Sequence, residues 1–411
     1  MSLPAFTAAE TKSPGFAWPL TRLDVAGAFG DIGVLFPLAI ALITLNHLNP
    51  TALFLAAGLT YCIAARYFQI PIAVQPLKAV AAIALALSLA PSAIASAGLL
   101  MGALLLLVGL TNLARWLAKL FTLPIVRGIQ LGLGLLLARE GFRLLLRPQG
   151  GRTLPGGALG PWLVALAGAA LLLAVRNSRR FPAALVLLAA GIALGVALDW
   201  GKLPALSFGL VPLELLHPQV AELKRVLPLL VIPQFALTFG NSIVATENTA
   251  QILYGVQARR VTVRALSLSI GIVNLASATI MGSPLCHGSG GITAHYRFGA
   301  RTPKSSYVIG GVCLLLAFFG RAAVGLLSLI PLAVLGVFLV YVGIQHAAYV
   351  RDILKRPSLL LIAIAVGLIS LLTTNLMWGF LAGFALHGIL WTCTQVRERR
   401  AKRDPPPPAR A

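Results

Sequence analysis

Apolar runs fill most of the chain and alternate with short polar connections. Each run is about 18–25 residues long, which is the length a helix needs to cross the hydrocarbon core of a bilayer. We therefore expect an all-α polytopic membrane protein with no sizeable soluble domain. The predicted segments are fourteen, near 25–45, 51–68, 71–90, 96–114, 120–138, 160–175, 182–199, 227–246, 262–280, 283–296, 305–320, 323–343, 358–373 and 375–395.

The third and tenth segments differ from the others because prolines interrupt their first residues, at Pro71 and Pro76 and at Pro284. A proline pushes the residue before it toward extended geometry and is well suited to the first turn of a helix. We expect each of these two segments to be a short strand that runs into a half-helix.

Three short motifs recur in the same order in the two halves of the chain. Residues 29–31, 76–79 and 124–129 return as 239–241, 284–287 and 331–336, at offsets of 210, 208 and 207. Each half holds seven segments, and because seven is odd the second half enters the membrane from the opposite side. This pattern predicts a 7+7 inverted repeat, as in transporters that bind substrate at broken helices. The expected parts are an N-terminal tail at 1–23, a first repeat at 24–200, a connector at 201–226, a second repeat at 227–395 and a disordered basic tail at 396–411.

Composition and charge support a membrane protein. Only 11% of the 411 residues are charged, whereas soluble proteins carry about a quarter, and the mean hydropathy is +0.89. The formal net charge of +22 comes from 33 Lys and Arg against 11 Asp and Glu, without the basic stripe and interleaved aromatics of a nucleic-acid binder. With the N-terminus inside, 23 of the cations fall on the cytoplasmic side and eight outside. The bias predicts an inner (plasma) membrane protein with both termini in the cytoplasm. No signal peptide is expected.

The two half-helices predict an anion site. A helix N-terminus presents unpaired N–H groups and a positive dipole end, and neither broken segment contains a carboxylate that would suit a cation. Lys78 could instead extend to the membrane interface, His287 could be a structural histidine, and Gly288 could serve close helix packing. The candidate substrate-binding residues are Gln75, Lys78, Gln234, Asn241, Ser283, His287, Gly288 and Ser289.

Two carboxylates are candidates for proton coupling, Asp31 and Glu247. Asp31 lies within the first segment, where an ionisable residue suggests function, although it could simply pair with Lys78 or Arg127 or cap a freed backbone group. Glu247 lies near the cytoplasmic end of the eighth segment and could face water. The chain shows no nucleophile–base pairing, Walker loop or HExxH motif. The four cysteines are scattered without metal-ligand spacing. We expect neither an enzyme nor a bound cofactor or metal.

Several stretches resemble signature motifs of the molybdate transporter family, a branch of the sulfate permease superfamily. They cover most of residues 24–345 and are FGDIG at 29–33, VQPLK at 74–78, NSIVA at 241–245, PLCHGSGG at 284–291 and YRFGAR at 296–301. The resemblance implies uptake of molybdate, a core domain of segments 1–4 and 8–11, and a gate domain of segments 5–7 and 12–14. Unlike in typical sulfate permeases, we expect no regulatory domain after the last segment, because the basic, proline-rich stretch at 395–411 is too short to fold. The chain also has Gly240-Asn241 where many of these permeases have a glutamate.

The expected function is therefore secondary active import of a tetrahedral oxyanion, with molybdate as substrate, by alternating access. Sulfate transport and an uncoupled channel or facilitator on the same fold are the alternatives, because backbone N–H groups do not distinguish the two dianions strongly. A nucleobase transporter is disfavoured, since the eighth and tenth segments lack the carboxylates it would need. The expected partners are the oxyanion and the lipid bilayer, without nucleic acid, while protons and a homodimer are left open.

Overall fold

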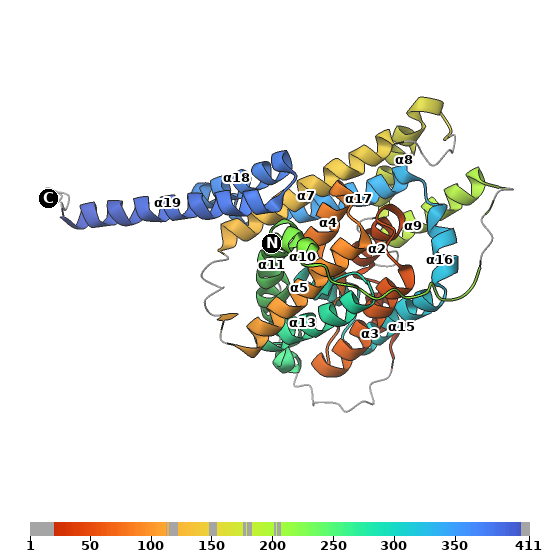
Figure 1. The fold of residues 1–411 in the computed structure, drawn as a ribbon, viewed down its shortest axis with the longest axis horizontal. Coiled ribbons are helices and arrows are strands. Elements are labelled where there is room, and N and C mark those ends of the chain that lie inside the picture. The colour runs from red at the N-terminus through yellow and green to blue at the C-terminus, as the bar shows by residue number, and fades with distance from the viewer. Residues whose placement is uncertain are drawn as a thin grey trace.

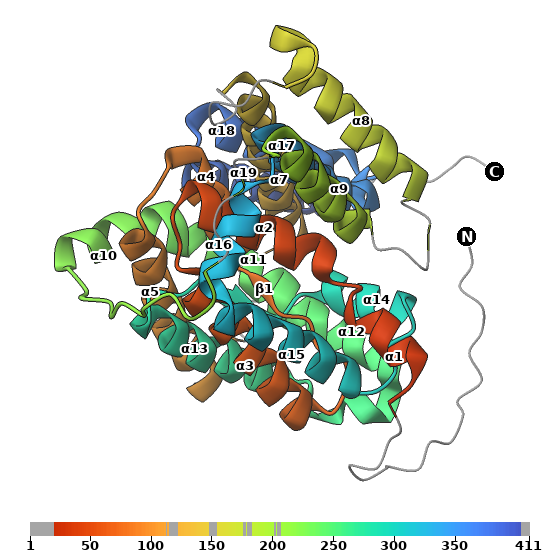
Figure 2. The ribbon, with the colours of Figure 1, turned by 90° about the vertical axis from the view of Figure 1, so that its right-hand side faces the viewer.

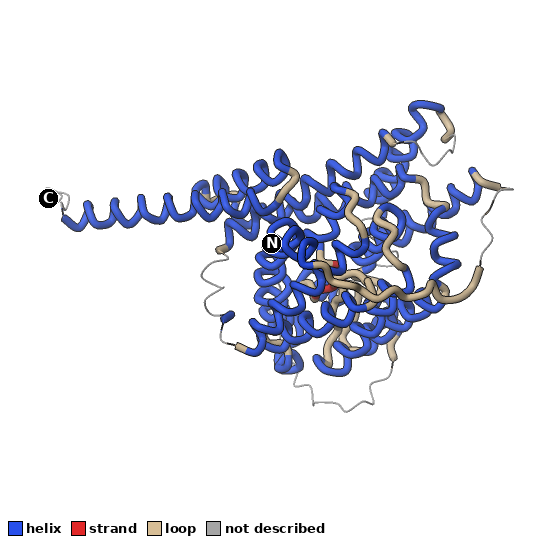
Figure 3. The backbone as a smooth tube through the Cα atoms, in the orientation of Figure 1, coloured by secondary structure: helices blue, strands red, loops and turns tan. Residues whose placement is uncertain are grey.

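The computed structural model describes residues 20–111, 113–114, 122–147, 154–175, 178, 183–200, 203 and 207–403. These residues are mostly helical (Figure 3). The helices of the first half are α1 (Arg22–Ala28), α2 (Ile32–Leu45), α3 (Pro50–Phe68), α4 (Lys78–Leu87), α5 (Pro91–Leu110), α7 (Leu123–Leu146), η1 (Gly157–Leu159), α8 (Gly160–Val175) and α9 (Ala183–Leu198). Those of the second half are α10 (Val220–Val226), η2 (Leu227–Val231), α11 (Ile232–Leu237), η3 (Thr238–Val244), α12 (Ala245–Tyr254), η4 (Gly255–Arg260), α13 (Val263–Thr279), α14 (Ser289–Arg297), α15 (Lys304–Phe318), α16 (Gly320–Ser328), α17 (Leu332–Ala347), η5 (Ala348–Ile353), α18 (Pro357–Thr373) and α19 (Leu376–Arg403).

The helices form two groups that lie on opposite sides of the molecule (Figures 1 and 2). In one group α3 packs on α15 and α5 packs on α13; in the other α7 packs on α17 and α18, and α18 packs on α19. Helices α2 and α4 lie between the groups, because α2 contacts α17 and α9 while α4 contacts both α5 and α7.

Six helical stretches of the described chain are long and apolar enough to cross a membrane, and the bent pair α15–α16 adds a seventh. Five further apolar helices have only 10–17 residues. Two predicted segments were wrong in their bounds, because the eighth begins at Val220 inside the expected connector and the twelfth is split between α16 and α17. The first keeps its expected extent as the stretch Arg22–Leu45, with a break between α1 and α2. The break between α1 and α2 contains Gly30, a glycine that packs against α14. The break between α16 and α17 ends at Pro331, and proline is common where a helix begins.

The strand-and-half-helix prediction for the third and tenth segments is confirmed. Strand β1 (Gln75–Pro76) leads into α4, and β2 (Leu285–Cys286) leads toward α14. The strands pair antiparallel, with Gln75 opposite Cys286 and Pro76 opposite Leu285. They lie near the middle of the molecule (Figure 3). The pairing brings the starts of the two half-helices together.

Extended backbone inside a membrane protein needs partners for its N–H and C=O groups. Asn274 of α13 supplies them for Leu285: its Nδ2 donates to the carbonyl at 2.8 Å and its Oδ1 accepts from the N–H at 2.9 Å. Ser306 of α15 does the same for Ile72, at 3.2 and 3.0 Å. Tyr61 of α3 donates to the Val74 carbonyl at 3.1 Å. Polar side chains on the flanking helices therefore hold both extended stretches.

Glycines allow α7 and α17 to cross at backbone distance. A Cβ added at Gly134 would lie 2.5 Å from the Gly343 carbonyl oxygen, and one at Gly141 would lie 2.6 Å from that of Gly336. In the same way, a Cβ added at Gly343 would lie 2.6 Å from the Gly134 carbonyl oxygen, and one at Gly336 would lie 2.6 Å from that of Gly141. This antiparallel contact has no room for a side chain at any of the four positions.

Candidate functional site

The starts of the two half-helices converge on Gly288, the residue that precedes α14. A Cβ at this glycine would lie 2.8 Å from Gln75 Oε1 and 3.4 Å from Lys78 Nζ. Gln75 belongs to β1 and Lys78 is the first residue of α4. The structure therefore brings together three residues that were predicted as substrate contacts from separate parts of the sequence.

A cavity of about 500 Å³ lies beside this point. Four predicted site residues line it: Asp31, Gln75, Lys78 and Asn241. Gly290 and Gly291 of α14 form another part of the wall. The opposite wall comes from α17 and η5 of the other helix group and consists of Tyr341, Gln345, His346, Ala348 and Tyr349.

Lys78 is a buried cation without a direct partner. Its side chain is 5% exposed, and within the described chain it makes no hydrogen bond or ion pair. A buried ammonium is normally paired because its desolvation is costly. Its Nζ faces the first turn of α14, where the dipole of the helix is also positive. Two sources of positive potential thus meet at one wall of the cavity.

The two half-helices are not equivalent as anion sites. Gln234 of α11 caps α4, because its Oε1 accepts from the N–H groups of Ala79 and Val80 at 2.7 and 3.2 Å. In α14 the N–H groups of Ser289, Gly290 and Gly291 have no acceptor among the described residues. Both half-helices were expected to present free N–H groups. Helix α14 does so, whereas Gln234 occupies two of those of α4.

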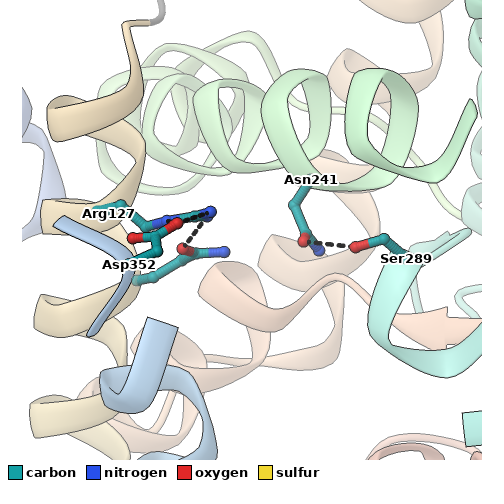
Figure 4. Close-up of polar contacts among 5 residues, drawn as sticks. Arg127, Asn241, Ser289 and Asp352 are labelled. Atoms are coloured by element: carbon teal, nitrogen blue, oxygen red, sulfur yellow. Dashed lines mark hydrogen bonds and ion pairs between the residues drawn. The ribbon is translucent and has the colours of Figure 1, made fainter. Parts of the chain in front are cut away.

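Asn241 and Ser289 connect the eighth and tenth segments. The Ser289 hydroxyl donates to Asn241 Oδ1 at 3.0 Å (Figure 4). Asn241 lies in the π-helix η3, a widened turn of the kind often found at functional sites. Its carbonyl accepts from Thr246 Oγ1 at 3.0 Å. The wide turn directs the Asn241 amide toward the start of α14.

Asp31 lies on the cavity wall between α1 and α2 and is 2% exposed. Its Oδ1 accepts from Gln75 Nε2 and its Oδ2 accepts from the Tyr61 hydroxyl at 3.3 Å. It forms no ion pair with Lys78. Arg127 pairs instead with Asp352 at 2.5 Å, so neither of the expected pairings of Asp31 is present (Figure 4).

Six predicted residues are not among those that line the cavity. Gly288 and Ser289 stand at the start of α14 beside it, whereas Gln234, Ser283, His287 and Glu247 lie elsewhere. His287 bridges two elements, since its Nδ1 contacts the Ala73 carbonyl and its Nε2 contacts the Ser269 hydroxyl, both at 2.9 Å. The Ser283 carbonyl accepts from Ser277 Oγ at 2.7 Å. Glu247 accepts from the first N–H of α13, at Val263. Their contacts in this structure are those of residues that hold elements in place.

Sequence reasoning missed the opposite wall and the partner of Asp31. Tyr61 sits in an apolar run, whereas His346 and Tyr349 follow the predicted twelfth segment and precede the charged pair Arg351 and Asp352; none of the three lies in a repeat motif. The Tyr349 hydroxyl lies 2.8 Å from the position of a Cβ at Gly290, and Arg127 lies over its ring at 5.7 Å. Arg127 also donates to Gln130 at 3.0 Å. These contacts link α7 and η5 directly behind the cavity wall.

A sequence model of one protein family, described as "Molybdate transporter of MFS superfamily", matches residues 24–137 and 227–345. Similar curated proteins carry related names. Molybdate transporter 2 of Arabidopsis thaliana is 30% identical over 89% of this chain and 87% of its own length. Molybdate transporter 1 of Chlamydomonas reinhardtii is 27% identical over 89% and 90%.

Solved structures share the fold. The transmembrane domain of the cyanobacterial bicarbonate transporter BicA superimposes with a TM-score of 0.63 at 21% identity, covering 88% of this chain and 97% of that one. The anion transporter Slc26a9, from mouse and in its inward-facing state, gives 0.63 at 15% identity, covering 95% and 74%. This chain therefore shares the overall fold of these two proteins.

Proposed function

Because this chain belongs to the molybdate transporter family, we propose that it is a secondary active transporter that imports a tetrahedral oxyanion, with molybdate as the substrate. The relatives are anion transporters and not enzymes, and the chain is a multi-pass membrane protein of that class. The single observation that supports the binding site most strongly is the position of Lys78. This residue is a buried cation, unpaired among the described residues, that lies beside the free N–H groups of α14 at one wall of the cavity.

The geometry suits a small dianion. Charge-assisted hydrogen bonds from an ammonium and from backbone N–H groups are shorter and stronger than neutral ones. Lys78, Gly288, Ser289 and Asn241 would surround the anion at the start of α14, with Gln75 beside it. Gln234 and His287 would shape the site indirectly, through α4 and through the extended stretch at Ala73. Ser283 would do the same from the extended residues that precede β2.

Alternating access would move the two helix groups against each other. We assign α1–α5 and α10–α16 to a core domain and α7–α9 and α17–α19 to a gate domain. Fourteen segments result when α7 and the half-helix α14 are added to the six long stretches, the bent pair and the five shorter helices. A 7+7 inverted repeat is supported by the reciprocal pairing of α3 with α15 and of α5 with α13, since exchanging the two halves converts one pair into the other.

Import of a dianion into a cell with a negative interior needs an energy source. The membrane opposes each charge by about 2.3 kcal/mol per 100 mV, or about 4.6 kcal/mol for two. Cotransport of two protons would neutralise the moved charge. Asp31, the carboxylate on the cavity wall, is the coupling residue in this proposal, and Glu247 is not, because it caps α13 outside the cavity. Both termini would lie in the cytoplasm, as the cation distribution requires.

Binding to the purified protein tests the substrate. Molybdate, tungstate, sulfate and uracil are titrated in parallel by calorimetry. We expect molybdate and tungstate to bind and uracil not to bind, because uracil carries no charge for Lys78. Tighter binding of sulfate than of molybdate would change the assigned substrate to sulfate and leave the proposed anion site unchanged. Binding of uracil alone would refute the anion site.

A further inference from the structure

The Gln75 side chain stands between a carboxylate and the anion site. Its Nε2 donates to Asp31 Oδ1, whereas its Oε1 is buried and has no hydrogen-bond partner among the residues that the structure describes. That unpaired oxygen lies 2.8 Å from the position of a Cβ at Gly288, and Lys78 Nζ lies 3.4 Å from the same position. The amide oxygen is therefore turned toward the start of α14.

This orientation does not suit an occupied site. An amide oxygen only accepts hydrogen bonds, and so does every oxygen of a fully deprotonated oxyanion. With an anion at the start of α14, Gln75 Oε1 would place one acceptor against another in a buried setting. The Asp31 carboxylate, held by the same amide, would add a negative charge close by.

A proton on Asp31 removes both conflicts. A protonated carboxyl group gains an O–H donor, which can donate to Gln75 Oε1 once the amide has turned by half a rotation. The amide Nε2 then points to the start of α14 and can donate to the anion. Protonation also removes the negative charge of Asp31.

We propose that Asp31 and Gln75 form a proton-dependent switch, in which protonation of Asp31 turns the Gln75 amide and supplies the anion with a hydrogen-bond donor. Anion and one proton then bind together. Gln75 contacts the substrate in this scheme, and Asp31 is a positioning residue that acts through it. The inference rests on the proposed function, because it needs the anion at the start of α14.

Other titratable groups face this pair from the surrounding elements. Tyr61 on α3 donates to Asp31, and His295 on α14 packs edge-on against Tyr61 at 6.3 Å between ring centroids. Lys78 on α4 brings a positive charge, and Cys286 on β2 is paired opposite Gln75. Across the cavity are His346, Tyr341 and Tyr349, and Arg297 of α14 also lines it. Among the cavity-lining residues that the structure describes, Asp31 is the one carboxylate, so a switch that needs an acid on the wall must use it.

The dissociation constant of molybdate, measured by calorimetry at several pH values near and above neutrality, tests the switch. Uptake of one proton with the anion makes the wild-type constant fall about tenfold for each unit by which the pH falls. Asp31→Asn places an amide N–H where the carboxyl O–H would be. We expect this variant to bind molybdate with a pH-independent constant that matches the acid limit of the wild type. Glu247→Gln, the same carboxylate-to-amide change outside the cavity, should keep the wild-type slope.

A Gln75→Leu background separates the amide rotation from simple charge removal. If Asp31 acts through Gln75, then Asp31→Asn should tighten molybdate binding when Gln75 is present but not when it is combined with Gln75→Leu. A flat wild-type pH profile, or an Asp31→Asn effect that survives Gln75→Leu in full, overturns the switch while leaving the substrate assignment intact. Absence of molybdate binding by the folded wild type at every pH refutes the proposed function itself, and the switch with it.

Discussion

Gln234 Oε1 accepts a hydrogen bond from the Ala79 N–H at 2.7 Å, across 155 positions of sequence. The same oxygen also accepts from Val80, while Gln234 Nε2 donates to Thr238 at 2.7 Å. A side chain from α11 thus takes up N–H groups that the half-helix α4 would otherwise offer to an anion. The substrate is left with α14 and with the cation at the start of α4.

Gln234→Leu should therefore weaken the fold more than the binding site. Loss of a helix cap costs about 1 kcal/mol, and here two buried N–H groups lose their acceptor, so we expect about 1–3 kcal/mol of destabilisation. Thermal unfolding in detergent measures it. Thr238→Val removes the partner of Gln234 Nε2 but keeps the acceptor of Ala79 and Val80, so it serves as the matched control. A molybdate affinity that falls as far in Gln234→Leu as in a Lys78 variant would instead indicate direct contact with the substrate.

Lys78→Ala should lower molybdate affinity by about ten- to a hundredfold, as expected for loss of one charge-assisted contact worth about 1.5–3 kcal/mol. Lys78→Arg keeps the charge and should lose less. Lys224→Ala, at an exposed lysine of α10, controls for the change in net charge. Equal binding by folded Lys78→Ala and by the wild type would remove Lys78 from the site.

Gly141→Ala should destabilise the protein by about 1–3 kcal/mol, the usual cost of overpacking. The added Cβ would lie 2.6 Å from the Gly336 carbonyl oxygen on α17. Gly311→Ala on α15 is the matched control, because a Cβ there has nothing within 4 Å. The measurement is the midpoint of thermal unfolding for the two variants. Similar midpoints would show that α7 and α17 can move apart enough to accommodate the added methyl group.

The orientation in the membrane can be tested at His47, an exposed residue between α2 and α3. With both termini in the cytoplasm, an epitope tag inserted after His47 should be accessible to antibody on intact cells, and a tag at the C-terminus should not be. The cation distribution is the physical reason, since basic connections are retained on the cytoplasmic side. Protection of the position-47 tag in intact cells would reverse the orientation.

The extended stretches were predictable from sequence because proline acts on its own neighbours. Pro76 and Pro284 constrain local backbone, so the two half-helices and their convergence followed from residues a few positions apart. The roles of Gln234 and His287 did not follow, because their partners at Ala79 and Ala73 lie 155 and 214 positions away. A polar residue near a broken helix can face the cavity or brace the backbone, and only the packing distinguishes the two.

The opposite wall was unpredictable for a related reason. His346 and Tyr349 reach the cavity because α17 crosses α7 at glycine contacts, and that crossing depends on four glycines in helices far apart in the chain. Asp31 could be singled out as a rare acid in an apolar segment. Its partners Gln75 and Tyr61 could not be assigned, since a buried carboxylate pairs with whichever donors the fold supplies.

Uptake of labelled molybdate into proteoliposomes, with and without an inward proton gradient, tests the central claim most directly. A coupled importer accumulates molybdate above its external concentration only when protons flow inward, because cotransported protons offset the charge of the dianion. We predict gradient-dependent accumulation by the wild type and its loss in Asp31→Asn, which lacks the titrating carboxylate. Molybdate entry that ignores the gradient and stops at equal concentrations would contradict coupled transport and identify the protein as a facilitator.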